Sequence, residues 1–131
     1  MLVETTELKL LVWSVILTVI QMAVAVTGAT LQVGVAGLAG NREDLPKITG
    51  WAGRASRAHR NMLENLVLFA VLVVAASISG KINATTTLGA ELFFWGRLTY
   101  APIYILGVPW LRTAAFAVSL VGLFMIFAQL L

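Results

Sequence analysis

A short segment of the chain gathers most of the side chains that could do chemistry, and it runs without a break into an apolar stretch. In a helix, successive residues turn by about 100°, so five polar residues of segment 53–65 share an arc of about 100°. They are Arg54, Arg57, Asn61, Glu64 and Asn65. His59 points to the other side, where a packed or solvated histidine is favoured over a catalytic base. One helix face therefore presents two guanidinium groups, two amides and a carboxylate.

Glu64 lies two residues before the apolar run 66–74, and a carboxylate inside a membrane is costly unless it has a partner. Arg57 or Arg60 of the same helix can supply one, in which case the pair only holds the bundle together. However, one carboxylate cannot satisfy all the arginines and amides of this segment. The surplus favours a ligand with several charges, because arginines bind carboxylates, Glu64 can bind an ammonium and Asn61 a peptide group. Glutathione has these three features.

A second polar stripe lies further along the chain. Arg97, Tyr100 and Tyr104 are spaced as neighbours on one helix face, and Arg112 follows after a turn. Tyrosines near a membrane interface are as often simple anchors as ligand contacts. A free thiol has a pKa of about 8.5, and a neighbouring guanidinium or phenol hydrogen bond lowers it. Arg112 is the residue that we expect beside such a thiol.

The elements that carry these residues are expected to cross a membrane. The chain is 60% hydrophobic and 11% charged, whereas about a quarter of a soluble domain is charged. Four apolar segments are expected to be helical, over residues 8–38, 53–79, 86–106 and 108–131. At about 1.5 Å per residue, each is long enough for roughly 30 Å of hydrocarbon. The prediction is an all-α membrane protein, an up-down-up-down bundle of four transmembrane helices in a single domain over 1–131.

Composition also excludes several classes of function. The 131 residues include no cysteine, so a zinc thiolate site, an iron–sulfur cluster and a cysteine nucleophile are excluded, and we expect no metal. Any thiol must come with the ligand. The net charge of +3 comes without a basic run of the kind that binds nucleic acid.

Basic residues are unevenly distributed between the two ends of the predicted bundle. The first loop and its flank carry Arg42, Lys47, Arg54, Arg57 and Arg60. Arg112 flanks the third loop, and the opposite side offers Lys9 and Lys81. Since cytoplasmic loops are enriched in lysine and arginine, we expect both termini outside the cytoplasm and the polar cluster near the cytoplasmic face of the membrane.

These residues resemble a family signature. The pattern Arg54-x-x-Arg57-Ala-His59-Arg60-Asn61-x-x-Glu64 resembles that of the MAPEG superfamily (membrane-associated proteins in eicosanoid and glutathione metabolism). This superfamily includes microsomal glutathione transferases, leukotriene C4 synthase and microsomal prostaglandin E synthase. The loop 41–46 resembles that of bacterial members similar to microsomal glutathione transferases. The spacing of Arg97, Tyr100, Tyr104 and Arg112 extends the resemblance over nearly the whole chain.

The resemblance implies a homotrimer in the bacterial inner (plasma) membrane, with three sites between neighbouring subunits. Each site would hold glutathione, the cosubstrate, in a bent form beside a hydrophobic small-molecule substrate from the membrane lipid. By matching position, Arg57, Asn61 and Glu64 would bind its peptide groups, and Tyr100 and Tyr104 would add hydrogen bonds. Arg112 would stabilise the thiolate, with Arg54 as a helper.

The expected function is a glutathione transferase or peroxidase that attacks hydrophobic electrophiles or lipid peroxides. Some eicosanoid-making members have an arginine late in the first helix, where this chain has Leu31. The family also contains a lipid-delivery protein without catalysis, so a non-catalytic lipid-binding or scaffold protein is the alternative. A small multidrug exporter fits poorly, because the arginines would repel a cationic drug.

Overall fold

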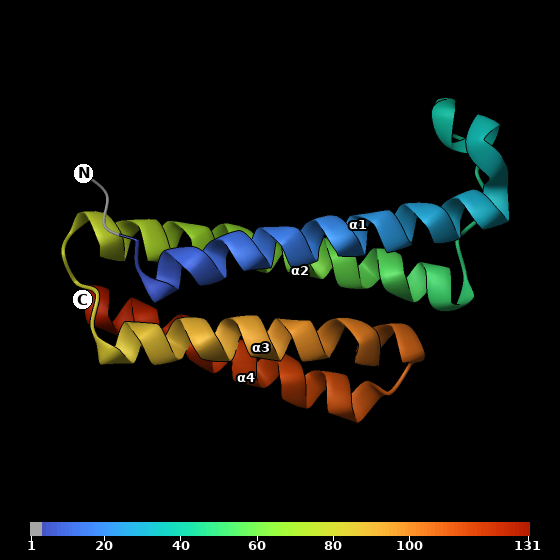
Figure 1. Cartoon of the computed structure of the whole chain (residues 1–131). Helices are drawn as coiled ribbons and strands as arrows, with labels where there is room; N and C mark the ends of the chain where they lie inside the picture. The colour runs from blue at the N-terminus through green and yellow to red at the C-terminus, as the bar shows by residue number, and fades with distance from the viewer. Residues whose placement is uncertain (1–3) are drawn as a thin grey trace.

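Four antiparallel helices lie side by side in an elongated bundle (Figure 1). The computed structural model describes residues 4–131. The helices are α1 (Thr6–Ala39), α2 (Gly50–Ile78), α3 (Ala84–Leu106) and α4 (Pro109–Leu130), and no strand occurs among the described residues. The start of α1 and the end of α4 lie at the same end of the bundle (Figure 1). The all-α prediction with four helices is confirmed.

Local sequence sets where the helices begin and end. Asn83 and Thr86 form a reciprocal capping box that starts α3 at Ala84, two residues before the predicted start. Gly107 ends α3 in the left-handed conformation (φ 83°), which glycine adopts without a steric penalty. Pro109 then occupies the first turn of α4, where its missing N–H has no partner to lose. The α3–α4 connection is therefore very short.

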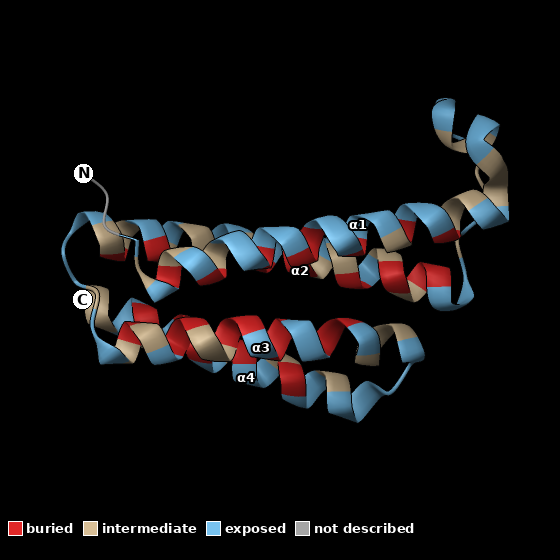
Figure 2. Cartoon of the chain, in the orientation of Figure 1, coloured by how far each residue is buried: buried red, intermediate tan, exposed pale blue. Residues whose placement is uncertain are grey.

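Three of the helices, α1, α2 and α4, are long and apolar enough to cross a membrane. The remaining helix, α3, has 23 residues, or about 35 Å at 1.5 Å per residue, but its middle carries Glu91 and Arg97. Buried and exposed positions alternate along each helix, and the buried ones lie mostly between neighbouring helices (Figure 2). Large apolar side chains cover much of the exterior, as expected for a surface that meets lipid.

Close backbone contacts hold α3 against α4. A Cβ atom added to Gly122 would lie 2.8 Å from the Phe93 amide nitrogen, so only glycine fits there. The Phe93 ring stacks on Phe69 of α2, with 4.1 Å between the ring centres. These contacts fix the position of α3 relative to both α2 and α4.

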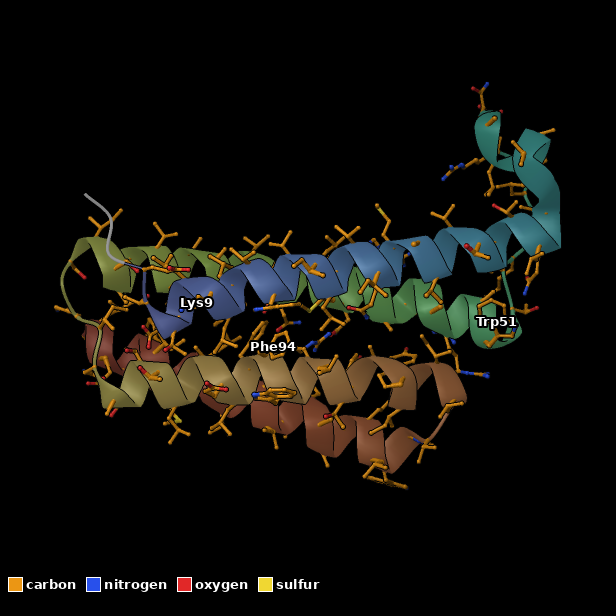
Figure 3. The ribbon with its side chains drawn as sticks, in the orientation of Figure 1. Lys9, Trp51 and Phe94 are labelled. Atoms are coloured by element: carbon orange, nitrogen blue, oxygen red, sulfur yellow. The ribbon has the colours of Figure 1, made fainter. Side chains whose placement is uncertain are left out.

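The long helix α1 bends near its end. Gly34 has a non-helical backbone (φ 78°, ψ 164°), and beyond it the chain turns away from the bundle (Figure 1). The Gln32 side chain bonds the Thr49 amide nitrogen (3.0 Å) and carbonyl oxygen (2.7 Å). This double contact returns the chain to α1 just before α2 begins. Trp51 lies there, at the end of the bundle opposite to Lys9 (Figure 3).

Candidate functional site

A cavity of about 390 Å³ lies between α2, α3 and α4, toward the end of the bundle opposite to the start of α1 and the end of α4. Its lining is dominated by polar and aromatic side chains, namely Arg57, Arg60, Asn61, Glu64, Tyr100, Tyr104, Arg112, Thr113 and Phe116. Six of the seven residues proposed from sequence therefore line one cavity, and Arg54 is not among the lining residues. Three arginines and one glutamate give the lining a formal charge of +2 (3 − 1), which favours an anionic ligand.

Helical spacing explains how each helix contributes. Arg57, Asn61 and Glu64 follow one another at intervals of four and three residues, so they occupy one face of α2. On α3, Tyr100 and Tyr104 are one turn apart and meet edge to face, with ring centres 5.5 Å apart. The cavity is thus formed by one turn or two of each helix.

Tyr104 lies between two arginines of the cavity. The Nε of Arg57 donates a hydrogen bond of 3.3 Å to the Tyr104 hydroxyl oxygen. The Arg112 guanidinium carbon lies 4.4 Å from the centre of the Tyr104 ring, in the range of a cation–π contact. The tyrosine therefore links the arginine of α2 to that of α4, and its hydroxyl and its ring make different contacts.

Asn61 is oriented by a residue of its own helix. The Asn65 side-chain nitrogen donates to the Asn61 backbone oxygen (2.9 Å) and to its Oδ1 (3.4 Å). Because Oδ1 already accepts this bond, the amide nitrogen of Asn61 remains as the donor for a ligand. Asn65 shares the polar face predicted from sequence, but it is buried and acts on Asn61 rather than lining the cavity.

Arg54 has a different environment from the other predicted residues. Its Nε donates a 2.8 Å hydrogen bond to the Ile105 carbonyl oxygen, one of the last carbonyls of α3. Such carbonyls lack a partner within their own helix, so the guanidinium satisfies the helix end. Gly107 lies against the same guanidinium. Arg54 thus joins the start of α2 to the α3–α4 turn beside the cavity.

His59 lies away from this cavity, as its helical spacing predicts. It lines a separate groove of about 530 Å³ between α1 and α2, together with Ser56 and Arg42. The lining of the polar cavity includes neither His59 nor Leu31, and Leu31 is exposed on α1.

Three lining residues were not proposed as site residues from sequence. Arg60 was predicted as a partner for Glu64 and belongs to the family pattern, and its distance of four residues from Glu64 also places both side chains on one face. Phe116 follows Arg112 by one turn of α4, a spacing that could have identified it. Thr113 has no such signal, because its hydroxyl bonds the Pro109 carbonyl oxygen (3.0 Å), as in many ordinary helices.

An apolar groove of about 360 Å³ begins one turn beyond the polar cavity on the same two helices. It is lined by Leu68, Val71, Leu72, Leu120, Leu123, Phe124 and Phe127. Leu68 follows Glu64 of α2 by four residues, and Leu120 follows Phe116 of α4 by four. A charged cavity and an apolar groove therefore adjoin along the α2–α4 surface.

Comparison with known protein families identifies a family that covers nearly the whole chain. Residues 10–131 match the model of the MAPEG family, which covers all four helices except the first turn of α1. No curated protein and no solved structure matches the chain. The matched range includes every residue of the polar cavity and of the apolar groove.

Proposed function

The chain belongs to the MAPEG family. We propose that this integral membrane protein is a glutathione-dependent transferase and peroxidase, which uses the same thiolate in both reactions. Its substrates would be hydrophobic electrophiles or lipid peroxides dissolved in the membrane. The observation that carries this proposal is the adjoining pair of cavities on α2 and α4, one lined by three arginines and a glutamate, the other apolar.

Glutathione fits the residues of the polar cavity in charge and in size. It has two carboxylates and one ammonium, so its net charge of about −1 opposes the positive lining. Arg57 and Arg60 would bind carboxylates through their planar donor groups, and Glu64 would bind the ammonium. Asn61 would donate to a peptide carbonyl. The volume of about 390 Å³ lies in the range of roughly 300–1,000 Å³ that is usual for small-molecule sites.

The chemistry would follow from activation of the ligand's thiol. The Arg112 guanidinium would lower the thiol pKa, while the Tyr100 hydroxyl would donate a hydrogen bond to the sulfur. In a transferase reaction, the thiolate forms a carbon–sulfur bond and the leaving group departs with its electron pair. In a peroxidase reaction, the sulfur attacks one peroxide oxygen, and the oxygen–oxygen bond breaks to give an alcohol after protonation. A second glutathione then releases water and leaves glutathione disulfide.

The apolar groove supports the choice of a membrane-dissolved substrate. Its lining is aliphatic and aromatic, so an acyl or aryl group can lie there while its reactive carbon or oxygen meets the sulfur. Lateral entry from lipid would bring the substrate, whereas glutathione would come from water. The proposed protein is a homotrimer with both termini outside the cytoplasm in a bacterial inner membrane, an orientation supported by the arginines near the cavity end.

The test is isothermal titration of the detergent-purified protein with glutathione, coupled to the ultraviolet absorbance of the thiolate. We expect binding with a thiolate signal at neutral pH. Arg112→Ala should keep most of the binding but lose turnover by about 100-fold, as when one donor to a developing anion is removed. Equal turnover in the wild type and this variant would contradict the assignment of Arg112 as the thiol-activating residue. Absence of binding at millimolar glutathione would favour the lipid-binding or scaffold alternative.

A further inference from the structure

Arg97 carries an unusual charge for the interior of a helix bundle. It is the largest of the fully buried side chains, with 1% of its surface exposed. None of its three guanidinium nitrogens has a hydrogen-bond partner among residues 4–131. It is the fourteenth of the 23 residues of α3, close to the middle of the helix. A buried charge without partners is strongly destabilising, so its presence needs an explanation other than stability.

The contacts of Arg97 lead directly to the polar cavity. Its guanidinium carbon lies 4.1 Å from the centre of the Tyr100 ring and 5.8 Å from that of Phe116. Tyr100 meets Tyr104 edge to face, and the Tyr104 ring lies under the Arg112 guanidinium. Two rings thus connect a buried arginine to the arginine of the cavity. We name this series Arg97–Tyr100–Tyr104–Arg112 the arginine–tyrosine ladder.

The ladder restricts the groups that it connects. A guanidinium is attracted to the face of an aromatic ring, and the attraction increases when water is excluded. Tyr100 is only 5% exposed, so Arg97 meets it in a dry environment. A cation on the buried side therefore keeps the Tyr100 ring in one position, and Tyr100 in turn supports the edge of Tyr104.

We propose that Arg97 is a positioning residue for thiol activation: from inside the bundle it fixes the two tyrosine rings, and through them the guanidinium of Arg112. This inference rests on the proposed function, because it assumes that Arg112 meets the glutathione sulfur. It explains why the charge is present at all. An apolar residue of similar volume would fill the space without the cost of desolvating a cation, but it would not attract the ring.

The experiment compares Arg97→Met, Arg97→Lys and a matched control, Gln21→Leu, in the full-length protein in detergent. Gln21 is also buried, at 4% exposed, and neither polar atom of its side chain has a partner among the described residues. It lies on α1, outside the ladder. The measurements are the thermal unfolding midpoint, glutathione affinity, the pH titration of the bound thiol and turnover at neutral pH.

We expect Arg97→Met to unfold at the same or a higher temperature than the wild type, since it removes an unpaired buried charge. Its glutathione affinity should change by less than about threefold, whereas the midpoint of the thiol titration should rise by about one pH unit. At a pH below both midpoints, that rise corresponds to about tenfold less thiolate, and turnover measured there should fall with the thiolate fraction. Arg97→Lys keeps a cation near the Tyr100 ring, so its thiol titration midpoint and its turnover should stay close to those of the wild type. Gln21→Leu should be at least as stable as the wild type, with unchanged thiol titration.

Two results would overturn the inference. One is a thiol titration in Arg97→Met that equals that of the wild type. The other is a lower unfolding temperature with equal losses of binding and turnover, which would mean a purely structural role. If Arg97→Met does not fold, the Arg97→Lys variant provides the test. A midpoint of its thiol titration far above that of the wild type would refute the ladder, because a cation near the Tyr100 ring would then not be enough to activate the thiol. Failure of the proposed function is distinguishable, since Arg112→Ala would then also leave the titration unchanged.

Discussion

Replacing Tyr104 by phenylalanine should weaken glutathione binding about fivefold and leave turnover close to that of the wild type. The substitution removes only the hydroxyl that accepts the Arg57 hydrogen bond, so the guanidinium of Arg57 loses the group that orients it. The bond is long, at 3.3 Å, and Arg57 is exposed, so its contribution lies below the roughly 1.5–3 kcal/mol of hydrogen bonds to charged groups, at about 1 kcal/mol. A change of about 1.36 kcal/mol is tenfold, so about 1 kcal/mol is about fivefold.

Tyr104→Leu provides the comparison, because it also removes the ring under Arg112. The guanidinium lies 4.4 Å from the ring centre, and such a contact contributes about 1 to 2 kcal/mol where water is partly excluded. We therefore expect turnover to fall by a further factor of about 5 to 30 in the leucine variant. Titration calorimetry gives the affinity, and steady-state kinetics with a hydrophobic electrophile gives the turnover.

The reasoning would be refuted if phenylalanine lowered turnover as much as leucine does, because the hydroxyl would then act in the reaction itself. It would also fail if both variants bound glutathione as tightly as the wild type. A control for general disturbance is Thr99→Ala, at an exposed position of α3 whose hydroxyl bonds only the Trp95 carbonyl in its own helix. That variant should match the wild type in both measurements.

Two further predictions concern the glutamate of the cavity and the α3–α4 contact. Glu64→Gln should bind glutathione about tenfold or more weakly, because the ammonium loses a charged partner, while the protein keeps its oligomeric state on size-exclusion chromatography. Loss of the oligomer instead would favour the scaffold alternative. Gly122→Ala should lower stability by about 1 to 3 kcal/mol, because a Cβ atom there would lie 2.8 Å from the Phe93 amide nitrogen. A thermal or denaturant unfolding curve that matches the wild type would contradict this tight packing.

Much of the cavity could be predicted because its residues obey helical spacing. Arg57, Asn61 and Glu64 share a face whatever surrounds α2, and the same holds for Tyr100 and Tyr104 on α3. The sequence also indicates which segments are apolar, and these segments predict the four helices. These are local properties, and they do not depend on how the helices pack.

The roles of Arg54 and Arg97 could not be predicted, because they depend on the packing of different helices. Arg54 reaches the end of α3 only because the start of α2 lies beside it, a register that helical spacing does not determine. The burial of Arg97 depends on the close approach of α4, where a Cβ atom added to Gly96 would lie 3.0 Å from the Ser119 amide nitrogen. The bend at Gly34 could not be predicted for another reason, because glycine in a helix also serves close packing, as Gly28 does against Ala52.

The short turn between α3 and α4 has a consequence for how the chain enters a membrane. An arginine at the centre of an isolated helix costs about 2.5 to 3.5 kcal/mol on insertion scales, and α3 also carries Glu91. Glu91 accepts a hydrogen bond from Trp95 of α3 itself, whereas the buried guanidinium of Arg97 lies near Phe116 of α4, and α4 packs closely against Gly89 and Gly96. Helix α4 therefore shields the charge of Arg97, which α3 cannot bury alone. The two helices would therefore leave the translocon as a hairpin, after synthesis of α4. A nascent chain that ends at residue 107 would retain α3 in an exposed state, where quality-control proteases act.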